Sequence, residues 1–390
     1  MNAVGKPKIV LLGMMTKIPV AGAVWGTMQY LVGLERLGYE AYYVEAHGRT
    51  PSMLMKRGED DSSALAAAYI DRVMRRFDLA DRWAFHALHT DGRCYGMTEG
   101  RLKDLYRDAA LIINYHGGTV PLPEHSSTGR LIYLETDPVE LEIELYHNDP
   151  AAIAFLEPHV AFFTWGLNYG HPDCQVPLPA RFPFKVTRPP VVMDLWEPFS
   201  SGPAEVFSTI GNWRQPGEVT YRGEVYTWSK HHEFLKFLEV PRRTGQAFEL
   251  GLSSYVEADK RLLESHGWRV RHAREFSQEV DPYRDYICRS RGEFTVAKDQ
   301  NVRLRSGWFS ERSAQYLAAG RPVITQETGF SNSLPTGKGL FGFSTVEEVV
   351  AAVEAVNADY SAHRRAAAAL ARDYFSYEVV LKAMLGEFGL

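Results

Sequence analysis

Residue types that bind phosphate gather in three loops of the second half of this 390-residue chain. Each loop follows a predicted strand or begins a predicted helix. Backbone N–H groups at such turns and helix starts neutralise anions together with cationic side chains. We therefore predict a site suited to phosphate, although structural turns with solvated charges fit the pattern too. Its residues are Gly211, Asn212 and Trp213, then Lys298 and Arg303, then Ser310, Glu311 and Arg312.

Acidic and imidazole side chains end predicted strands in the first half of the chain. An attacking hydroxyl group needs a carboxylate or an imidazole within hydrogen-bond reach to take its proton. Asp137 closes a strand in YLETDP, and His116 stands beside two glycines that leave space for a ligand. We predict that Asp137 or His116 is the general base. Asp137 as the cap of a helix over 139–146 and His116 as a structural histidine are the alternatives.

Four further residues of the first half are expected to contact or orient the molecule that carries this hydroxyl group. Glu135 precedes Asp137 by two residues and would orient whichever base acts. His171 in NYGHPD is a third candidate base. Trp165 and Tyr169 offer flat ring faces on which a sugar can stack, unless these rings fill the core.

The composition describes a folded protein, because 45% of the residues are hydrophobic. The formal net charge of −5 gives no support to nonspecific nucleic-acid binding, so we expect no nucleic-acid partner. Three scattered cysteines lack the spacing of a zinc site, and we expect no metal and a reducing compartment. No apolar run has the length of a bilayer span or the pattern of a signal peptide, which predicts a cytoplasmic protein.

Short apolar segments alternate with amphipathic ones along the whole chain, which indicates parallel sheets covered by helices. In the first half we expect strands at 8–13, 41–44, 111–114, 131–134 and 161–165, and helices at 25–37, 65–77 and 102–108. A proline-dense stretch from Pro177 to Pro198 predicts an irregular connection between two domains. Beyond it we expect strands at 205–210, 246–251, 268–272, 293–297 and 322–325, and helices at 231–238, 256–266, 280–289, 311–319, 346–357, 360–374 and 377–388.

The segment SERSAQYLAAGRPVITQETG at 310–329 resembles the donor-binding half of glycosyltransferases with the GT-B fold. The helix, the Gly-Arg-Pro-Val turn and the following strand carry the likeness, and the two closing helices fit it. The resemblance implies an α/β protein with two Rossmann-like domains that face each other across a cleft. Residues 1–195 would bind the acceptor and 196–375 the donor, while the helix at 376–390 crosses back to the first domain.

The resemblance also implies a nucleoside-diphosphate sugar as co-substrate, with no obligatory cofactor. In this family the donor sugar contacts the loop that here contains Thr328, Gly329 and Phe330. Many retaining members hold the donor ribose with a Glu five residues before the turn glycine, where this chain has Gln315. We expect Glu311 to take over that contact, and the altered position favours a metal-independent inverting displacement.

Other activities fit the same residues. A nucleotide-sugar 2-epimerase would use the same two-domain frame without an acceptor, and a non-catalytic subunit would bind the donor without turnover. A dehydrogenase is disfavoured because the loop at 13–22 has no close G-x-G-x-x-G. The sequence thus predicts a hexosyltransferase acting on a small-molecule or glycan acceptor, and leaves the base, the sugar, the acceptor and the oligomeric state open.

Overall fold

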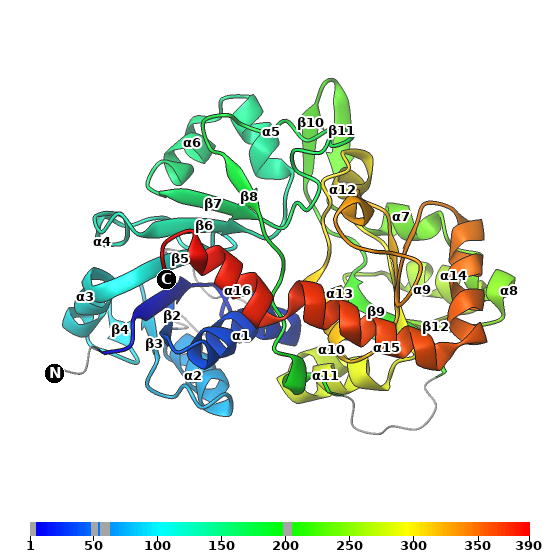
Figure 1. The fold of residues 1–390 in the computed structure, drawn as a ribbon, viewed down its shortest axis with the longest axis horizontal. Coiled ribbons are helices and arrows are strands. Elements are labelled where there is room, and N and C mark those ends of the chain that lie inside the picture. Colours follow the sequence, from blue (N-terminus) through cyan, green and yellow to red (C-terminus); the bar gives the residue numbers. More distant parts are fainter. Residues whose placement is uncertain (1–4, 48–53, 55–62, 198–204) are drawn as a thin grey trace.

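The computed structural model describes residues 5–47, 54, 63–197 and 205–390, and its larger sheets divide the chain into two halves (Figure 1). The first sheet is parallel except where β4 joins it antiparallel to β3. In spatial order its strands are β4 (Cys94–Tyr95), β3 (Trp83–His86), β2 (Glu40–Ala46), β1 (Lys8–Leu12), β5 (Ala109–Tyr115), β6 (Leu131–Glu135), β7 (Ala161–Thr164) and β8 (Phe184–Val186).

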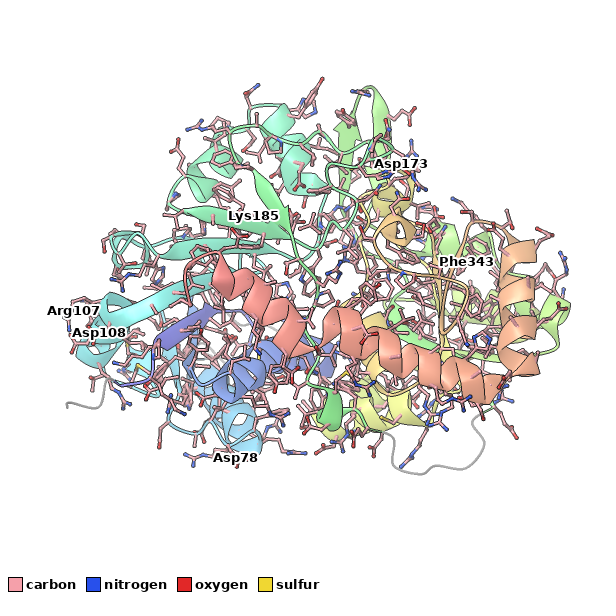
Figure 2. The ribbon with its side chains drawn as sticks, viewed as in Figure 1. Asp78, Arg107, Asp108, Asp173, Lys185 and Phe343 are labelled. Carbon is pink, nitrogen blue, oxygen red and sulfur yellow. The ribbon has the colours of Figure 1, made fainter. Side chains whose placement is uncertain are left out.

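The second sheet is parallel throughout. In spatial order its strands are β13 (Trp268–His272), β12 (Ala247–Ser253), β9 (Val206–Asn212), β14 (Gly292–Thr295), β15 (Val323–Gln326) and β16 (Leu340–Phe343). Its core is aromatic: Phe294 and Phe343 stack with ring centroids 5.3 Å apart. Phe343, labelled in Figure 2, is the last residue of β16 and belongs to this core.

Helices connect the parallel strands in both halves, as parallel pairing requires. Those of the first half are α1 (Ala21–Arg36), α2 (Ser63–Arg76), α3 (Glu99–Asp108), α4 (Pro123–Ser126), α5 (Glu140–Tyr146) and α6 (Pro150–Leu156). Those of the second half are α7 (His231–Leu235), α8 (Val240–Thr244), α9 (Glu257–Ser265), α10 (Arg274–Ser277), α11 (Val280–Arg289), α12 (Asp299–Arg303), α13 (Glu311–Ala318), α14 (Val346–Ala358), α15 (Tyr360–Leu370) and α16 (Tyr377–Gly386). The predicted α/β class with two parallel sheets is confirmed.

The last helix, α16, returns to the first half of the molecule, as expected. Figure 1 shows it in red across the blue α1, and Leu381 and Met384 are buried in the core of the first sheet. Gly33 in α1 permits this contact, since a Cβ atom there would lie 2.8 Å from the Leu381 Cδ1 atom. Lys185 on β8 forms an ion pair with Glu387 just beyond α16 (Figure 2).

The prediction that the proline-dense stretch contains no regular element is wrong. β8 lies inside it and pairs with β7, with Phe184 opposite Phe162. The residues from Phe184 to Arg188 contain no proline, and β8 is an edge strand that begins directly after Pro183. Proline is tolerated at that position because it withdraws no N–H from a central ladder.

A hairpin that the sequence analysis missed follows β9. It consists of β10 (Glu218–Tyr221) and β11 (Glu224–Thr227), joined by Arg222 and Gly223. Both linking residues have positive φ, 51° and 79°, as two-residue hairpin loops favour. The hairpin reaches the first half, because Tyr221 packs edge-on against Tyr146 of α5 with ring centroids 5.1 Å apart.

Candidate active site

Both sheets reverse their strand order at one point, and the candidate residues gather there. The first sheet reverses between β1 and β5, and the second between β9 and β14. In open α/β sheets, ligands bind beyond the carboxyl ends of the strands at such a reversal. His116 directly follows β5, and Lys298 follows β14 within three residues.

Loops beside the two reversal points meet across the junction of the halves. The Asp137 Oδ2 atom accepts a hydrogen bond from the Lys298 Nζ atom, so a carboxylate beyond β6 pairs with a cation beyond β14. Trp308 Nε1 donates to the Thr136 carbonyl oxygen at 3.1 Å, and Trp308 also forms an isolated antiparallel bridge with Gly166. These contacts place residues of both halves in one site.

Three cations lie close together on the second half: Lys298, Lys230 and Arg312. The Lys298 Nζ atom lies 4.5 Å from the ring centroid of Trp228, and the Lys230 Nζ atom lies 5.1 Å from that of Trp308. Burial, with the nearby charges of Arg312 and Lys298, lowers the pKa of Lys230 to about 7. Such a cluster of cations favours an anion as ligand, because an anion would relieve their mutual repulsion.

The start of α13 adds backbone donors beside this cluster. Ser310 caps the helix as predicted, and its Oγ atom accepts from the Arg312 N–H at 3.2 Å. The Arg312 side chain points inward: its Nε atom donates to Glu293 Oε1 at 2.6 Å and its Nη2 atom to Thr295 Oγ1 at 3.1 Å. The charge of Arg312 is therefore largely balanced by Glu293 in a buried ion pair.

The carboxylate and the imidazole of the first half lie next to each other. His116 adopts φ of 61°, and its Nδ1 atom is hydrogen-bonded to Thr136 Oγ1. The Asp137 Oδ1 atom is buried and has no hydrogen-bond partner among the described residues. The capping alternative for Asp137 is wrong, because the N-cap of α5 is Val139, whose N–H is bound by Glu142.

His116 should stay neutral over most of the acidic range. Burial lowers its pKa from 6.5 to about 4, so the unfolded chain takes up a proton at higher pH than the folded protein does. Stability should therefore fall as the pH drops from about 7 towards 4. Urea unfolding at pH 7, 6 and 5 should show a smaller loss in His116→Asn, because Asn tolerates this φ value but does not titrate. His232→Asn, at an exposed position, is the control, and an equal loss in both variants would contradict the assignment.

Comparisons with known proteins bear on the fold. No protein-family model and no curated protein sequence matches this chain. An alpha-glucosyltransferase solved with UDP and a 13-mer DNA matches 99% of this chain and 100% of its own, with a TM-score of 0.60 and 10% identity. Anabaena Alr3699/HepE, solved with UDP-glucose, matches 98% and 99%, with a TM-score of 0.55 and 12% identity. The sucrose-phosphate synthase of Thermosynechococcus elongatus matches 98% of both chains, with a TM-score of 0.52 and 10% identity.

The chain has the GT-B fold. The likeness extends over nearly the whole length of each compared protein, and it includes both sheets and the returning helix α16. At such low identity it establishes the architecture, and the site of this GT-B protein has to be argued from its own residues.

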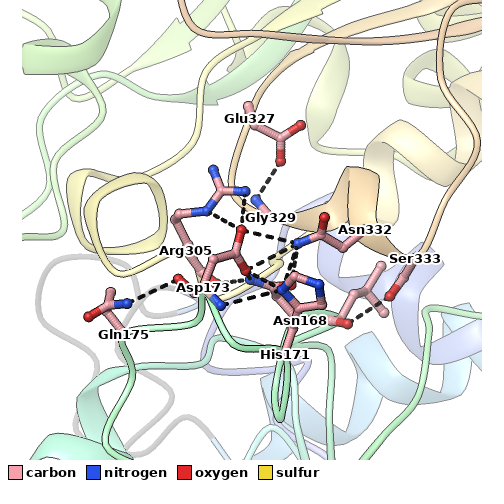
Figure 3. Close-up of polar contacts among 10 residues, drawn as sticks. Asn168, His171, Asp173, Gln175, Arg305, Glu327, Gly329, Asn332 and Ser333 are labelled. Carbon is pink, nitrogen blue, oxygen red and sulfur yellow. Dashed lines mark hydrogen bonds and ion pairs between the residues drawn. The ribbon is translucent and has the colours of Figure 1, made fainter.

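A polar network joins the halves of this GT-B protein (Figure 3). Asp173 accepts from Asn168 Nδ2 at 2.8 Å and from Asn332 Nδ2 at 3.1 Å, and it pairs with Arg305 at 2.7 Å. The hydrogen bond from Asn168 is the largest cause that lowers the pKa of Asp173 well below its usual range. His171 Nδ1 lies 2.5 Å from Asp173 Oδ1, so this candidate base belongs to the junction between the halves (Figure 2 labels Asp173 there).

The loop that contains Thr328 and Gly329 closes against the same network. Gly329 has φ of 99°, and a Cβ atom there would overlap the Asn168 Nδ2 atom. Thr328 Oγ1 donates to the Trp308 carbonyl oxygen at 2.8 Å. Glycine at 329 is thus required by the close approach of the two halves as well as by its backbone angle.

Several predicted contact residues do not present their side chains to the junction. Trp165 and Trp213 are each 1% exposed and Phe330 is fully buried, so these rings pack in the cores. Arg303 donates to the Val225 carbonyl oxygen at 2.8 Å and holds the hairpin. Gly211 is open, since a Cβ atom added there would meet nothing within 4 Å, whereas Asn212 accepts from Ser253 through its side chain.

Gln315 and Glu135 are buried with unsatisfied polar atoms. Both amide atoms of Gln315 lack a hydrogen-bond partner among the described residues. Glu135 accepts from Thr164 Oγ1 at 2.6 Å through one oxygen, while its other oxygen lacks such a partner.

Glu311 is half-buried, and its charge raises the pKa of Tyr30 and Tyr115 in addition to the larger effect of their burial. It therefore faces the first half.

Sequence reasoning missed Lys230 and the tryptophans at 228 and 308. Lys230 stands 17 residues after Trp213, on the far side of the unexpected hairpin, so its place beside Lys298 could not be read from spacing. The runs WSK and SGWF, which combine aromatic residues with lysine or glycine beside the predicted loops, were the available signal.

Within the described residues, no group of three or more His, Cys, Asp or Glu side chains is arranged to hold a metal ion, and metal independence stays a prediction. Among the same residues, no helix combines the length and the apolar character that crossing a membrane requires.

Proposed function

We propose that this protein is a glycosyltransferase that moves a sugar from a nucleoside-diphosphate sugar to an acceptor hydroxyl group. The observation that carries the proposal is the pairing of Lys298 with Asp137. The pairing places Lys298 of the second half, a cation suited to binding phosphate, beside Asp137 of the first half, a carboxylate suited to accepting a proton. Structures of the same fold solved with UDP or UDP-glucose support a nucleotide sugar as the donor. We take 1–195 as the acceptor domain, 196–375 as the donor domain and 376–390 as the returning segment.

The second half binds the donor in this proposal. Lys298, Lys230 and the N-terminal end of α13 stabilise the diphosphate, which gains negative charge as the glycosidic bond breaks. Gly211 lets the backbone approach a phosphate closely. The amide of Gln315, which has no partner within the described residues, meets the ribose together with Glu311.

The first half supplies the base. Asp137 Oδ1 accepts the proton of the acceptor hydroxyl group, while Oδ2 stays oriented by Lys298. Arrival of the diphosphate gives Lys298 a second anion to bind, which weakens its hold on Asp137 and makes the carboxylate a stronger base. A base that acts in this way implies one displacement with inversion of the anomeric carbon, which NMR of the product tests.

Donor binding is tested first and turnover second. Thermal unfolding with UDP, dTDP and their glucose conjugates should show an increase in the melting temperature for at least one nucleotide, because a ligand that binds only the folded form stabilises it. Release of the nucleoside diphosphate is then measured with and without a panel of hydroxyl acceptors. Asp137→Asn should retain donor binding and lose about 10²–10⁴-fold in turnover, the contribution usual for a general base. Asp71→Asn, at a partly exposed residue of α2, is the matched control.

The outcomes separate the competing functions. An epimerised donor formed without acceptor would establish an isomerase instead. Binding without turnover over a broad acceptor panel would favour a binding subunit. Unchanged turnover in Asp137→Asn would remove Asp137 from the mechanism while leaving sugar transfer intact.

A further inference from the structure

Two glutamates lie buried against each other behind Asp137. Glu135 ends β6 and Glu142 lies in α5, and their side chains are 2% and 0% exposed. Each carboxyl group acts on the pKa of the other through side-chain hydrogen bonding, so the two lie close together. Within the described residues, neither carboxyl forms an ion pair with a lysine, an arginine or a histidine. Two carboxylates in such surroundings would repel each other strongly.

The donors around the pair satisfy only half of its oxygens. Thr164 Oγ1 donates to Glu135 Oε2 at 2.6 Å, and the Val139 N–H donates to Glu142 Oε2 at 2.8 Å. The Oε1 atoms of both glutamates are buried and accept no hydrogen bond within the described residues, although the Tyr169 hydroxyl is near enough to Glu142 to lower the pKa of that carboxyl. A proton between the two carboxyl groups would give the pair the donor it lacks, and it would remove one of two buried charges.

We propose that Glu135 and Glu142 share one proton and act as positioning residues for the turn at 136–139, which carries Asp137. Their positioning role rests on the proposed function, whereas the shared proton does not. In the pair one carboxyl is neutral and donates its O–H to the other, which remains charged. Burial raises the pKa of both carboxyl groups, in agreement with a retained proton.

The pair ties together the two loops of the first half that meet Lys298 and Trp308. Glu142 holds the N–H of Val139, which has φ of 107°, a strained value for a β-branched residue. Glu135 binds Thr164, whose Oγ1 atom accepts from the Gly166 N–H at 3.0 Å. Loss of the proton would therefore strain both the turn that contains Asp137 and the loop that contacts Trp308.

Five titratable groups act on the pair from the packed elements, and all are acidic. Tyr133 comes from β6, Asp137 from the turn, Glu144 from α5, and Tyr169 and Cys174 from the loop after β7. The charge of Asp137 raises the pKa of Glu135 further, although Lys298 forms an ion pair with Asp137. A carboxyl pair with only acidic neighbours should release its proton at a pH well above the usual range for glutamate.

The sign of the pH dependence follows from the raised pKa. The folded protein holds a proton that the unfolded chain releases near pH 4.5, so stability declines as the pH rises through the value of the folded pair. Glu142→Gln imitates the pair with its shared proton: Glu135 carries the one negative charge, and the new amide supplies the one donor. The amide can donate to Glu135 and accept from the Val139 N–H. This variant should lose the pH-dependent decline, whereas Glu264→Gln, at an exposed glutamate of α9, should retain it.

The test measures urea unfolding midpoints of the full chain from pH 5 to 9, together with the carboxyl ¹³C shifts of labelled glutamate. We expect the urea unfolding midpoint of Glu142→Gln to change less with pH than that of wild type. We also expect one carboxyl titration of wild type to be absent from that variant. Profiles that coincide with wild type would overturn the shared proton, whether or not the protein transfers sugar.

Activity then tests the positioning role. Glu142→Ala should lower kcat about tenfold or more with little change in the donor KM, since a displaced turn misplaces the base. Glu142→Gln should restore kcat and remain active at alkaline pH where wild type declines. If Glu142→Ala fails to fold, the alkaline pH profile of Glu142→Gln decides alone. Equal kcat values and equal pH profiles in wild type and variants would overturn the positioning role.

Discussion

Lys298→Ala is expected to lower kcat/KM for sugar transfer about 10²–10³-fold, the loss typical when one donor to a developing anion is removed. Lys298 is 7% exposed, and it is the cation that contacts both the ring of Trp228 and the carboxylate of Asp137. Its removal takes charge from the diphosphate site, and it also frees Asp137 from its only ion-pair partner within the described residues. Most of the effect should fall on kcat, because the leaving group gains charge in the transition state.

The measurement is steady-state transfer with the donor identified by thermal unfolding, together with direct titration of the nucleoside diphosphate. Lys260→Ala is the matched control, because Lys260 also forms an ion pair with a carboxylate: its Nζ atom lies 3.8 Å from Glu264 Oε1 on α9, at a partly exposed position. If Lys298→Ala keeps both its donor affinity and its turnover within a factor of about two of the wild-type values, the diphosphate binds elsewhere.

Arg312→Met is expected to destabilise the protein by about 3–5 kcal/mol, the range for removing one partner of a buried ion pair. Glu293 is fully buried, and its Oε1 atom accepts from Arg312 Nε at 2.6 Å. Without Arg312 the carboxylate would keep, among the described residues, only a hydrogen bond of 3.4 Å from Thr209 Oγ1. It would therefore be an almost uncompensated charge in the core of the second sheet.

The second substitution Glu293→Leu in the same chain should restore much of that stability, because two buried charges replaced by apolar side chains can be nearly neutral. Urea unfolding of wild type, both single variants and the double variant gives the coupling between the two residues. Arg72→Met, at an exposed residue of α2, is the control and should change stability by less than about 1 kcal/mol. Additive losses in the double variant would mean that the two side chains are not coupled.

The features predicted correctly from the sequence depend on neighbours along the chain. Ser310 caps α13 through a hydrogen bond to an N–H two residues away, and Gly320 ends that segment with φ of 62°. The alternation of strands and helices follows in the same way from local hydrophobic patterns. β8 escaped prediction because the prolines that flank it dominated the local pattern, and its formation depends on pairing with β7.

The residues of the candidate site show the same difference between local and tertiary information. Lys298 and Asp137 could each be proposed from the end of a predicted strand, but they are 161 residues apart and only the packing of the halves pairs them. Lys230 reaches the site because the hairpin returns the chain there, and no periodic pattern encodes that return. Trp165 was expected to offer a stacking face, yet it is 1% exposed, because burial depends on which neighbours the tertiary structure supplies.

Residue order alone was sufficient to establish the α/β class, the two sheets and the kinds of residue that end their strands, because hydrophobic periodicity and capping act over a few residues. Which of those strand ends meet was settled only when the two halves packed together, because Lys298 and Asp137 are 161 residues apart. Which side chains lose solvent depends on neighbours that only the tertiary structure supplies, and the charge of each buried group depends on what surrounds it.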